Sequence, residues 1–419
     1  MPLDIIVGLQ LGDEGKGKIV DILAPDYKIV ARYQGGPNAG HTLVINNKKF
    51  VFHTLPSGVV HSNMINVLGA GMVIDPVILK KEIDELQKQN ISIEGRLKIS
   101  RNAHLILPTH RLLDKFYEYE KGINKIGSTL KGISPAYQDK YSRSGIKTGE
   151  ILKKDFKDQF QFLKKQHMNI LGSVENDEPG YEEEWHNAIN FLKTIGFSDT
   201  ERYLNNELAN GTNILAEGAQ GTLLDINFGT FPFVTSSNTI SSGACIGLGI
   251  SPIYVKKIYG VFKAYTTRVG AGPFLTEQIN AEGDKLRDIG MEYGSTTGRP
   301  RRCGWLDLVA LKYAIMLNGI NRLVITKSDV LSDLDEIKIC TNYLNEKGLS
   351  VDYSDIDYCE QVTPEYQTFN SWKQDLRNFS TDTLLPTEFK SYINFIEKYL
   401  NLHISIISTG PDRNQTIIR

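Results

Sequence analysis

The 419-residue chain has little of several features that would each narrow its class. Its four cysteines (Cys245, Cys303, Cys340 and Cys359) show no C-x-x-C spacing, which argues against a disulfide framework or a zinc site. No apolar run approaches about 18 residues, so no membrane span is expected. The N-terminus lacks the basic region and apolar segment of a signal peptide. A reducing, cytoplasmic location is therefore the default expectation.

An excess of one charge is also missing, since 47 Lys and Arg residues stand against 49 Asp and Glu residues. This near-neutral balance disfavours general nucleic-acid binding, which leaves a basic footprint. Hydrophobic residues make up 41% of the chain, enough for a sizeable core. No repeat, low-complexity tract or composition break divides the sequence. We therefore expect a single large α/β domain over residues 1–419, with residues 122–210 as a loop and helical insertion.

The segment Gly12-Asp13-Glu14-Gly15-Lys16-Gly17-Lys18 follows an apolar run at residues 5–9 that is typical of a buried strand. Its glycines let backbone N–H groups approach an anion, and its lysines supply positive charge. The spacing satisfies the first part of the P-loop pattern, but Ile19 stands where that pattern requires Ser or Thr. Asp13 inside the loop is thus a metal ligand, a base, or a sign that the phosphate interpretation is wrong.

Strand, glycine-rich turn, helix and a second strand at residues 27–32 form a βαβ pattern. The pattern predicts a large central, mostly parallel twisted sheet flanked by helices, P-loop-like, with helical and loop insertions. A hairpin is expected at residues 42–53. Residues 122–149 have little hydrophobic periodicity and are interpreted as a surface loop. Further strands are expected at 213–216, 257–262, 322–326, 337–344 and 403–407, and helices at 76–90, 110–120, 150–210, 305–317 and 384–400.

Lys327-Ser328-Asp329 ends the strand expected at residues 322–326. A carboxylate at Asp329 can accept hydrogen bonds from both N1–H and the exocyclic amine of guanine, while the stem of Lys327 packs along the base. Adenine would leave that carboxylate unpaired, and such polar mismatches discriminate strongly. Alone, the motif is weak evidence for guanine binding, and a simple turn is its ordinary interpretation. The phosphate-loop candidate in the same chain strengthens the guanine interpretation.

Three arginines lie in Thr296-Thr297-Gly298-Arg299-Pro300-Arg301-Arg302. Arginine forks pair bidentately with carboxylates and phosphates. A solvated turn is one interpretation, and a nucleic-acid patch is disfavoured because no aromatic residues interleave. A small dianionic or dicarboxylate ligand fits this segment better.

His41 directly follows Gly40 in a glycine-rich turn, where a histidine can serve as a general acid or stabilise charge. The other seven histidines have no such neighbours and are interpreted as structural: His53, His61, His104, His110, His167, His186 and His403. Residues 217–222 and 234–239 are polar stretches that are either turns or nucleotide contacts. Arg143 is an isolated arginine whose ordinary interpretation is a solvated surface residue.

Together these segments resemble the adenylosuccinate synthetase family, and the match runs nearly end to end. The residues that carry the resemblance are 12–18, 34–41, 129, 135–137, 143, 217–224, 234–239, 263–273, 296–302, 304–307, 326–327, 329 and 408–411. The resemblance implies a ligase that converts IMP, L-aspartate and GTP into adenylosuccinate, GDP and phosphate through a 6-phosphoryl-IMP intermediate. This is the first committed step from IMP to AMP, with GTP as co-substrate and one Mg²⁺ per subunit.

By position, the resemblance implies that Asp13, His41, Lys16 and Gln220 are catalytic, with Asp13 as general base and His41 as general acid. It implies GTP contacts from Gly12, Asp13, Glu14, Gly15, Lys16, Gly17, Lys18, Gly40, His41, Thr42, Arg301, Lys327, Ser328, Asp329, Ser408, Thr409 and Gly410. IMP contacts are implied for Asp13, Lys16, Asn38, Ala39, Gly40, His41, Thr129, Arg143, Gln220, Thr235 and Arg299. Aspartate contacts are implied for Ser295, Thr296, Thr297, Gly298, Arg299 and Arg301. Magnesium ligands are implied at Asp13 and Gly40.

The resemblance also implies a homodimer in which Arg143 reaches the IMP phosphate of the neighbouring subunit. The chain departs from the family pattern at Pro300, which stiffens the aspartate loop, and at Ser328, which replaces an apolar residue. A GTP-binding switch and an inactive homologue acting as an interaction protein are the alternatives. Neither accounts for the arginine-rich loop together with Asp13 and His41.

Overall fold

A nine-stranded sheet runs through the centre of the computed structural model, which describes residues 2–45, 48–172, 178–294, 298–356 and 362–419. The strand order is β18-β17-β14-β10-β1-β9-β2-β5-β7, and every neighbouring pair is parallel except β17 and β18. The predicted α/β fold with a mostly parallel sheet is confirmed. The strands of this sheet are β1 (Leu3–Gly8), β2 (Ile29–Arg32), β5 (Ile65–Leu68), β7 (Leu97–Ile99), β9 (Ile214–Glu217), β10 (Val255–Lys263), β14 (Arg322–Thr326), β17 (Ile404–Ser408) and β18 (Thr416–Ile418).

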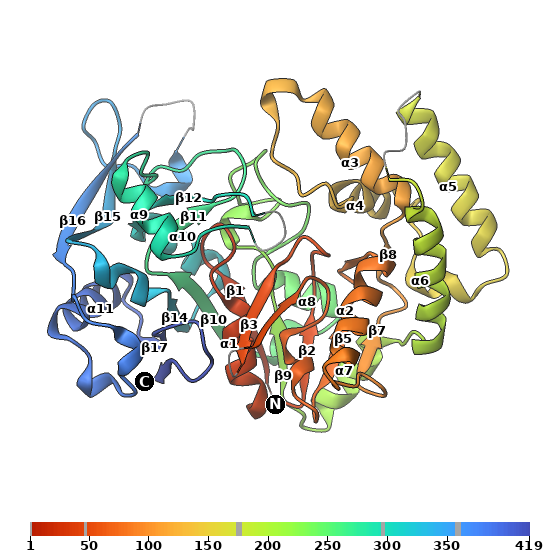
Figure 1. The fold of residues 1–419 in the computed structure, drawn as a ribbon, viewed down its shortest axis with the longest axis horizontal. Helices are drawn as coiled ribbons and strands as arrows, with labels where there is room; N and C mark the ends of the chain where they lie inside the picture. Colours follow the sequence, from red (N-terminus) through yellow and green to blue (C-terminus); the bar gives the residue numbers. More distant parts are fainter. Residues whose placement is uncertain (1, 46–47, 173–177, 295–297, 357–361) are drawn as a thin grey trace.

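Smaller sheets and the helices surround this sheet (Figure 1). The remaining strands are β3 (His41–Ile45), β4 (Lys48–Phe52), β6 (Val73–Ile74), β8 (His104–Leu105), β11 (Thr266–Arg268), β12 (Arg302–Gly304), β13 (Leu306–Asp307), β15 (Glu336–Leu344) and β16 (Thr363–Asn370). The helices are α1 (Lys16–Leu23), α2 (Pro76–Lys88), α3 (Pro108–Glu120), α4 (Ile133–Ser142), α5 (Phe156–Leu171), α6 (Tyr181–Ile195), α7 (Thr200–Ala209), α8 (Ser242–Leu248), α9 (Ala281–Ile289), α10 (Leu308–Asn318) and α11 (Thr387–Leu400).

Strand β1 is buried on both faces, as a central strand of a parallel sheet must be. Because successive side chains alternate across a strand, Ile5 and Val7 face one layer and Ile6 faces the other. The first layer packs residues of α7, α8, α10 and α11 against the sheet, and the second packs α1. The apolar run at the N-terminus therefore anchors the phosphate-loop candidate at the centre of the molecule.

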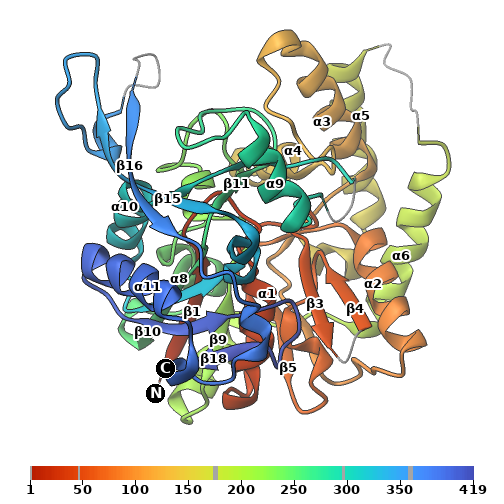
Figure 2. The same cartoon turned by 60° about the vertical axis from the view of Figure 1, so that its left-hand side comes forward.

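Helices α3, α4, α5 and α6 form a peripheral group on the opposite side of the molecule from α11 and β16 (Figures 1 and 2). The helical character expected within residues 150–210 is confirmed by α5, α6 and α7. The interpretation of residues 122–149 as a loop is wrong in part, because α4 occupies Ile133–Ser142. Its buried side packs Ile133, Ala136 and Tyr137 against the neighbouring core, and so short an apolar face leaves little periodicity to detect.

Most predicted elements appear within a few residues of their expected ends, including the β3–β4 hairpin. The helix expected from residue 305 begins instead at Leu308, because the Asp307 side chain accepts a hydrogen bond from Ala310 N at 3.0 Å and caps it. Helix α2 begins after Asp75, which caps Val77 N and Ile78 N in the same way. Within the described ranges, no helix combines the length and apolar character needed to cross a membrane.

Candidate active site

Six of the segments that carry the motifs follow the carboxyl ends of neighbouring parallel strands. Residues 9–18 follow β1, residues 218–224 follow β9 and residues 33–41 follow β2; residues 264–273 follow β10, residues 327–329 follow β14 and residues 409–411 follow β17. Parallel strands end at one common edge, and ligands of open α/β sheets bind at that edge. The sheet therefore gathers motifs hundreds of residues apart into one site.

The loop after β1 is shaped to hold an anion. Gly12, Asp13 and Gly15 adopt left-handed conformations, with φ of 89°, 58° and 85°, which turn the backbone before α1 begins at Lys16. The buried Glu14 carboxylate accepts hydrogen bonds from Gly12 N at 2.9 Å and Gln10 N at 3.2 Å, and pairs with Lys16 Nζ at 2.5 Å. Inward-facing N–H groups and a lysine thus already bind a carboxylate, which is the chemistry of a phosphate cradle.

Asp13 lies beside a buried network of charges. Its Oδ2 atom is 2.9 Å from Nη2 of Arg301, and its side chain is 33% exposed. Arg301 also donates to Glu292 at 2.5 Å, and Glu292 accepts from Tyr265 at 2.6 Å and Lys263 at 3.2 Å. Burial would raise the pKa of Glu292, but the positive charges around it, including Lys263 and Arg301, hold the pKa at about 2. The candidate base is therefore held in place by a fixed arginine.

His41 is oriented by Glu217, at the end of β9. Nδ1 of His41 contacts Oε1 of Glu217, and that carboxylate also accepts from Ser57 N at 2.7 Å and Ser57 Oγ at 2.6 Å. Burial lowers the pKa of His41, with the negative charge of Glu217 opposing that shift. A carboxylate on Nδ1 orients the ring and leaves Nε2 as the ring atom available for proton transfer.

Some of the residues predicted to contact IMP lie close together on the β2 and β9 side of the site. Asn38 Nδ2 lies 3.5 Å from Thr235 Oγ1, so the loop after β2 meets the segment at 234–239. Gln220 has a left-handed backbone (φ 57°), and its Oε1 lies 3.4 Å from Gln34 Nε2. Three segments far apart in sequence thus place amides and a hydroxyl at one edge of the sheet.

The residues proposed to contact GTP converge on the other side of β1. Lys18 Nζ donates to Ser408 Oγ at 2.8 Å and to the Gly410 carbonyl at 2.6 Å, which joins α1 to the turn after β17. Burial lowers the pKa of Lys18 to about 8. Thr326 at the end of β14 donates to the Glu14 carbonyl at 2.6 Å, so Lys327, Ser328 and Asp329 start beside the loop. Thr409, like Ser328, is fully buried there.

Burial raises the pKa of Asp329, with the positive charges of Lys327 and Lys18 opposing the shift. Lys327 has a left-handed backbone with φ of 61°, and its Nζ donates to the Gly290 carbonyl at 2.7 Å. A carboxylate that is costly to desolvate at the end of β14 suits a ligand that donates hydrogen bonds to it.

Other predicted residues lie outside this buried centre. Thr129, Arg143 and Arg299 are exposed, and Arg143 caps the carboxyl end of α4 with φ of 68°. Gly294 contacts both Gly298 and Arg299, because Gly294 N donates to the Arg299 carbonyl and Gly298 N donates to the Gly294 carbonyl, each at 2.8 Å. The aspartate contacts predicted at Ser295, Thr296 and Thr297 lie outside the described residues.

Sequence reasoning did not find the partners of the candidate catalytic groups. Glu217 was noted only within a polar stretch, and Glu292 was not singled out. Both glutamates are fully buried. Glu217 contacts His41, which is 176 positions away, and Glu292 contacts Lys263, which is 29 positions away. A buried glutamate at a strand end is the one signal that could have pointed to Glu217, because such a carboxylate needs a partner.

The fold and the site define a nucleotide-binding α/β enzyme, with an anion-binding loop, an oriented histidine and a carboxylate at the strand ends. The adenylosuccinate synthetase family model matches residues 5–417. The adenylosuccinate synthetases of Flavobacterium johnsoniae and Phocaeicola vulgatus are 51% and 49% identical over 424 and 421 residues, covering 100% of this chain and 100% and 99% of theirs. The fully ligated adenylosuccinate synthetase of Plasmodium falciparum is 40% identical, with a TM-score of 0.95 and full coverage of both chains. The chain therefore belongs to the adenylosuccinate synthetase family and is a ligase of purine biosynthesis.

Proposed function

We propose that this enzyme condenses IMP with L-aspartate at the expense of GTP, forming adenylosuccinate, GDP and phosphate. One observation carries the proposal. Asp13, His41 and the Lys327–Asp329 pair follow the carboxyl ends of β1, β2 and β14, three strands of one parallel sheet, in a chain that matches the family over residues 5–417. A base, an acid and a guanine-type recognition pair in one site are what a GTP-driven activation of a purine requires.

In the first step, the Asp13 carboxylate takes the N1 proton of IMP. The purine O6 then attacks the γ-phosphorus of GTP, so an O6–P bond forms while the bond from that phosphorus to the β,γ-bridging oxygen breaks. An ordinary carboxylate is a weak base toward a purine N1–H, so the charge on O6 must be captured as it develops. Phosphoryl transfer captures it, and Lys16 beside the loop stabilises the charge on the moving group.

His41 assists the departure of GDP. Its Nδ1 is held by Glu217, and Nε2 is the ring atom that can donate a proton or a hydrogen bond to the leaving phosphate oxygen. The buried position of the ring keeps the proton inside the site. His41 is thus placed on the opposite side of the reacting phosphorus from the nucleophile in this proposal.

In the second step, the amine of L-aspartate attacks C6 of the 6-phosphoryl intermediate. A C6–N bond forms, the C6–O6 bond breaks, and O6 leaves as part of inorganic phosphate. Gln220 lies at the IMP side of the loop, where its amide can orient the purine. The carboxylates of aspartate bind to the arginine-rich loop in this proposal, since arginine forks match carboxylates. The residues of that loop are Ser295, Thr296, Thr297, Gly298, Arg299 and Arg301.

Asp13 and the Gly40 carbonyl would hold Mg²⁺, together with phosphate oxygens of GTP. The donor set fits, because Mg²⁺ prefers carboxylate and carbonyl oxygens, and Asp13 is the partly exposed carboxylate of the loop. When bound, the ion supplies Lewis acidity that neutralises charge on the phosphates. We expect one ion per subunit.

The remaining assignments belong to the same proposal. Guanine is read by Asp329 with Lys327, and IMP is bound by Asn38, Ala39, Thr129 and Thr235 among others. Arg143 reaches the IMP phosphate of the neighbouring subunit, so the enzyme acts as a homodimer. A cytoplasmic location suits the three described cysteines, which are free.

One assay tests the proposal: the ultraviolet absorbance change on mixing the enzyme with IMP, L-aspartate, GTP and Mg²⁺, with each substrate omitted in turn. A change that needs all three substrates supports the ligase. GTP hydrolysis that proceeds without IMP would instead support a GTP-binding switch. An enzyme that binds the nucleotides but turns over none of them would contradict both.

A further inference from the structure

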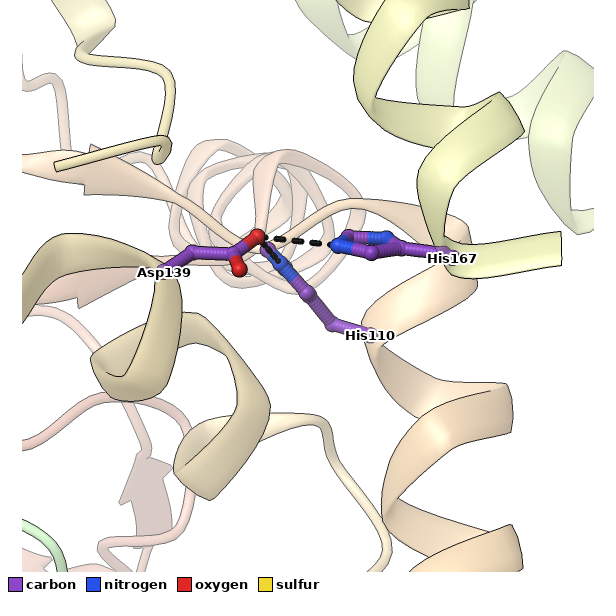
Figure 3. Close-up of side chains that lie close together, drawn as sticks. All are labelled: His110, Asp139 and His167. Atoms are coloured by element: carbon purple, nitrogen blue, oxygen red, sulfur yellow. Dashed lines mark hydrogen bonds and ion pairs between the residues drawn. The ribbon is translucent and has the colours of Figure 1, made fainter. Parts of the chain in front are cut away.

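Three buried side chains outside the strand-end site meet between three helices of the peripheral group. His110 of α3 and His167 of α5 both point at Asp139 of α4 (Figure 3). Nε2 of His110 is 2.8 Å from Oδ2 of Asp139, and Nε2 of His167 is 3.0 Å from the same oxygen. The two rings are 1% and 3% exposed, and Asp139 is 16% exposed. We call these three residues the His–Asp–His cluster.

The cluster has the composition of a metal site, and its three ligand atoms lie within 4.8 Å of one another. The hydrogen bonds argue against a metal. Leu107 N donates to Nδ1 of His110 at 2.9 Å, so Nδ1 carries no proton and the proton of the neutral ring sits on Nε2. That Nε2–H points at the Asp139 carboxylate and leaves no lone pair for a cation.

His167 fits the same pattern. Its Nδ1 lies 2.7 Å from the Thr109 hydroxyl, which can donate to it, while its Nε2 faces a carboxylate oxygen that only accepts. Both rings therefore donate N–H to one oxygen of Asp139. These contacts hold the pKa of Asp139 well below its usual range, although burial opposes that shift. The cluster is a proton-bridged clamp that joins α4 to α3 and α5.

The other polar atoms of Asp139 shape the turn that follows α4. Its backbone carbonyl accepts from Ser144 N at 3.0 Å and from Gly145 N at 2.9 Å, and its Oδ1 accepts from Ser144 Oγ at 3.3 Å. These bonds close the turn around Arg143, which stands in the left-handed region with φ of 68°. A residue other than glycine adopts that conformation only when surrounding contacts stabilise it.

We propose that Asp139, clamped by His110 and His167, is a positioning residue for Arg143. The clamp fixes the last turn of α4, and the turn holds the exposed arginine in one backbone conformation. Preorganisation of this kind raises affinity, because less conformational freedom is lost on binding. The inference rests on the proposed function, in which Arg143 binds the IMP phosphate of the neighbouring subunit. The clamp thus affects the KM for IMP at the neighbouring site, to which α4 contributes only its carboxyl end.

The test compares four variants by steady-state kinetics and thermal melting: Asp139→Ala, Asp139→Asn, Arg143→Leu and, as a control, Phe160→Leu. Asp139→Ala removes the clamp, so we expect the KM for IMP to rise about tenfold, with kcat and the KM for GTP within about twofold. Asp139→Asn can keep the pattern, with its oxygen toward the two N–H groups and its amide toward Ser144. We therefore expect its KM for IMP to stay within about threefold of the wild type.

Phe160 of α5 is fully buried in the core between α5 and α6, and it does not belong to the cluster. Phe160→Leu should lower the melting temperature and leave the KM for IMP unchanged, which separates positioning from general stability. His167→Gln is a second variant in case Asp139→Ala fails to fold, because glutamine keeps an N–H donor near the position of Nε2. It should retain most of the affinity for IMP.

Each remaining outcome overturns the inference in a distinguishable way. A raised KM for IMP in Arg143→Leu but not in Asp139→Ala would remove Asp139 as a positioning residue and leave the proposed function intact. No effect in Arg143→Leu would contradict the role proposed for that arginine itself. Stoichiometric zinc in the purified wild type, lost in Asp139→Asn together with activity, would show a metal site instead of a clamp. If Asp139→Ala and Phe160→Leu changed every kinetic constant equally, Asp139 would have only a structural role.

Discussion

Two parts of the site differ in how the fold holds them. The strand-end groups, Asp13, His41, Lys327 and Asp329, follow β1, β2 and β14. His41 is buried, Lys327 and Asp329 are half-buried, and the Asp13 side chain is 33% exposed but paired with Arg301. The peripheral groups, Thr129, Arg143 and Arg299, are exposed; Arg143 stands at the end of α4, and the other two lie outside the helices and strands. The first set is fixed by strand order, and the second by hydrogen bonds within its own loops and helices.

We expect the two parts to have different functions. Proton and phosphoryl transfer need groups held to a fraction of an ångström, which rigid strand ends supply. Contacts to the far ends of the substrates tolerate exposed loops, provided that the loops are ordered before binding. Changes in the strand-end groups should therefore reduce turnover or nucleotide choice, and changes in the peripheral groups should reduce affinity.

The largest effect is expected for Asp13→Asn. The amide cannot take the N1 proton of IMP, so kcat should fall by at least about 10³-fold. Because the side chain is partly exposed and nearly isosteric, the melting temperature should stay within about 2 °C. Pre-steady-state and steady-state rates of the ultraviolet change measure the loss. Turnover near that of the wild type would rule out Asp13 as the base.

Asp329→Asn tests nucleotide choice. The amide cannot accept both donors of guanine, so the KM for GTP should rise by about 10²- to 10³-fold. Xanthosine triphosphate carries a carbonyl where guanine carries its amine. Its KM should rise less than that of GTP, or should fall. The matched control is Asp333→Asn, because Asp333 is an exposed aspartate at the end of the same short 3-10 helix (Ser328–Asp333). It should change neither the KM for GTP nor the KM for xanthosine triphosphate.

Glu217→Gln should lower kcat by about 10²-fold without changing the KM for IMP, because the neutral amide no longer holds His41 as firmly for proton transfer. Glu82→Gln serves as its control, since Glu82 is another buried carboxylate but, within the described residues, accepts only from the backbone N–H groups of residues 53–55 rather than contacting a histidine ring. The control should lose stability and keep kcat. Similar kcat losses in both would mean that Glu217 acts on the fold alone.

Arg143→Leu should raise the KM for IMP about tenfold and leave kcat at saturating IMP nearly unchanged, since one charge-assisted contact to phosphate is lost. Mixing this variant with the Asp13→Asn protein should restore part of the activity. In a hybrid dimer, one site would keep Asp13 and also receive Arg143 from its partner. Absence of any recovery on mixing would count against a shared site.

The smallest effect concerns the strand-end part of the site. The Ser328 hydroxyl is buried and has no hydrogen-bond partner in the part of the chain that the structure describes. Ser328→Ala should therefore raise the free energy of unfolding of the nucleotide-free enzyme by about 1 kcal/mol. Ser332→Ala should instead lower the free energy of unfolding, because the Ser332 hydroxyl accepts a hydrogen bond from Trp372 Nε1 at 2.7 Å. Urea denaturation measures both.

The regular elements could be predicted because their patterns are local. The apolar run of β1, the glycine-rich turn and the amphipathic α2 are each encoded within about 15 residues. Helix α4 was missed because only one short face of it is apolar. The candidate residues themselves were found through resemblance to a family, and the roles given to them stay predictions, as does the single-domain assignment.

The sequence by itself determined the parallel α/β class and the glycine-rich loop after the first strand, since periodicity and turn residues are properties of neighbouring positions, and its resemblance to known sequences indicated the family. Only the tertiary structure decided which distant side chains meet. It joined His41 to Glu217, Asp13 to Arg301, and Asp139 to two histidines interpreted as ordinary structural residues. The physical reason is that such pairs depend on the order of strands in the sheet and the packing of helices, which no local pattern records.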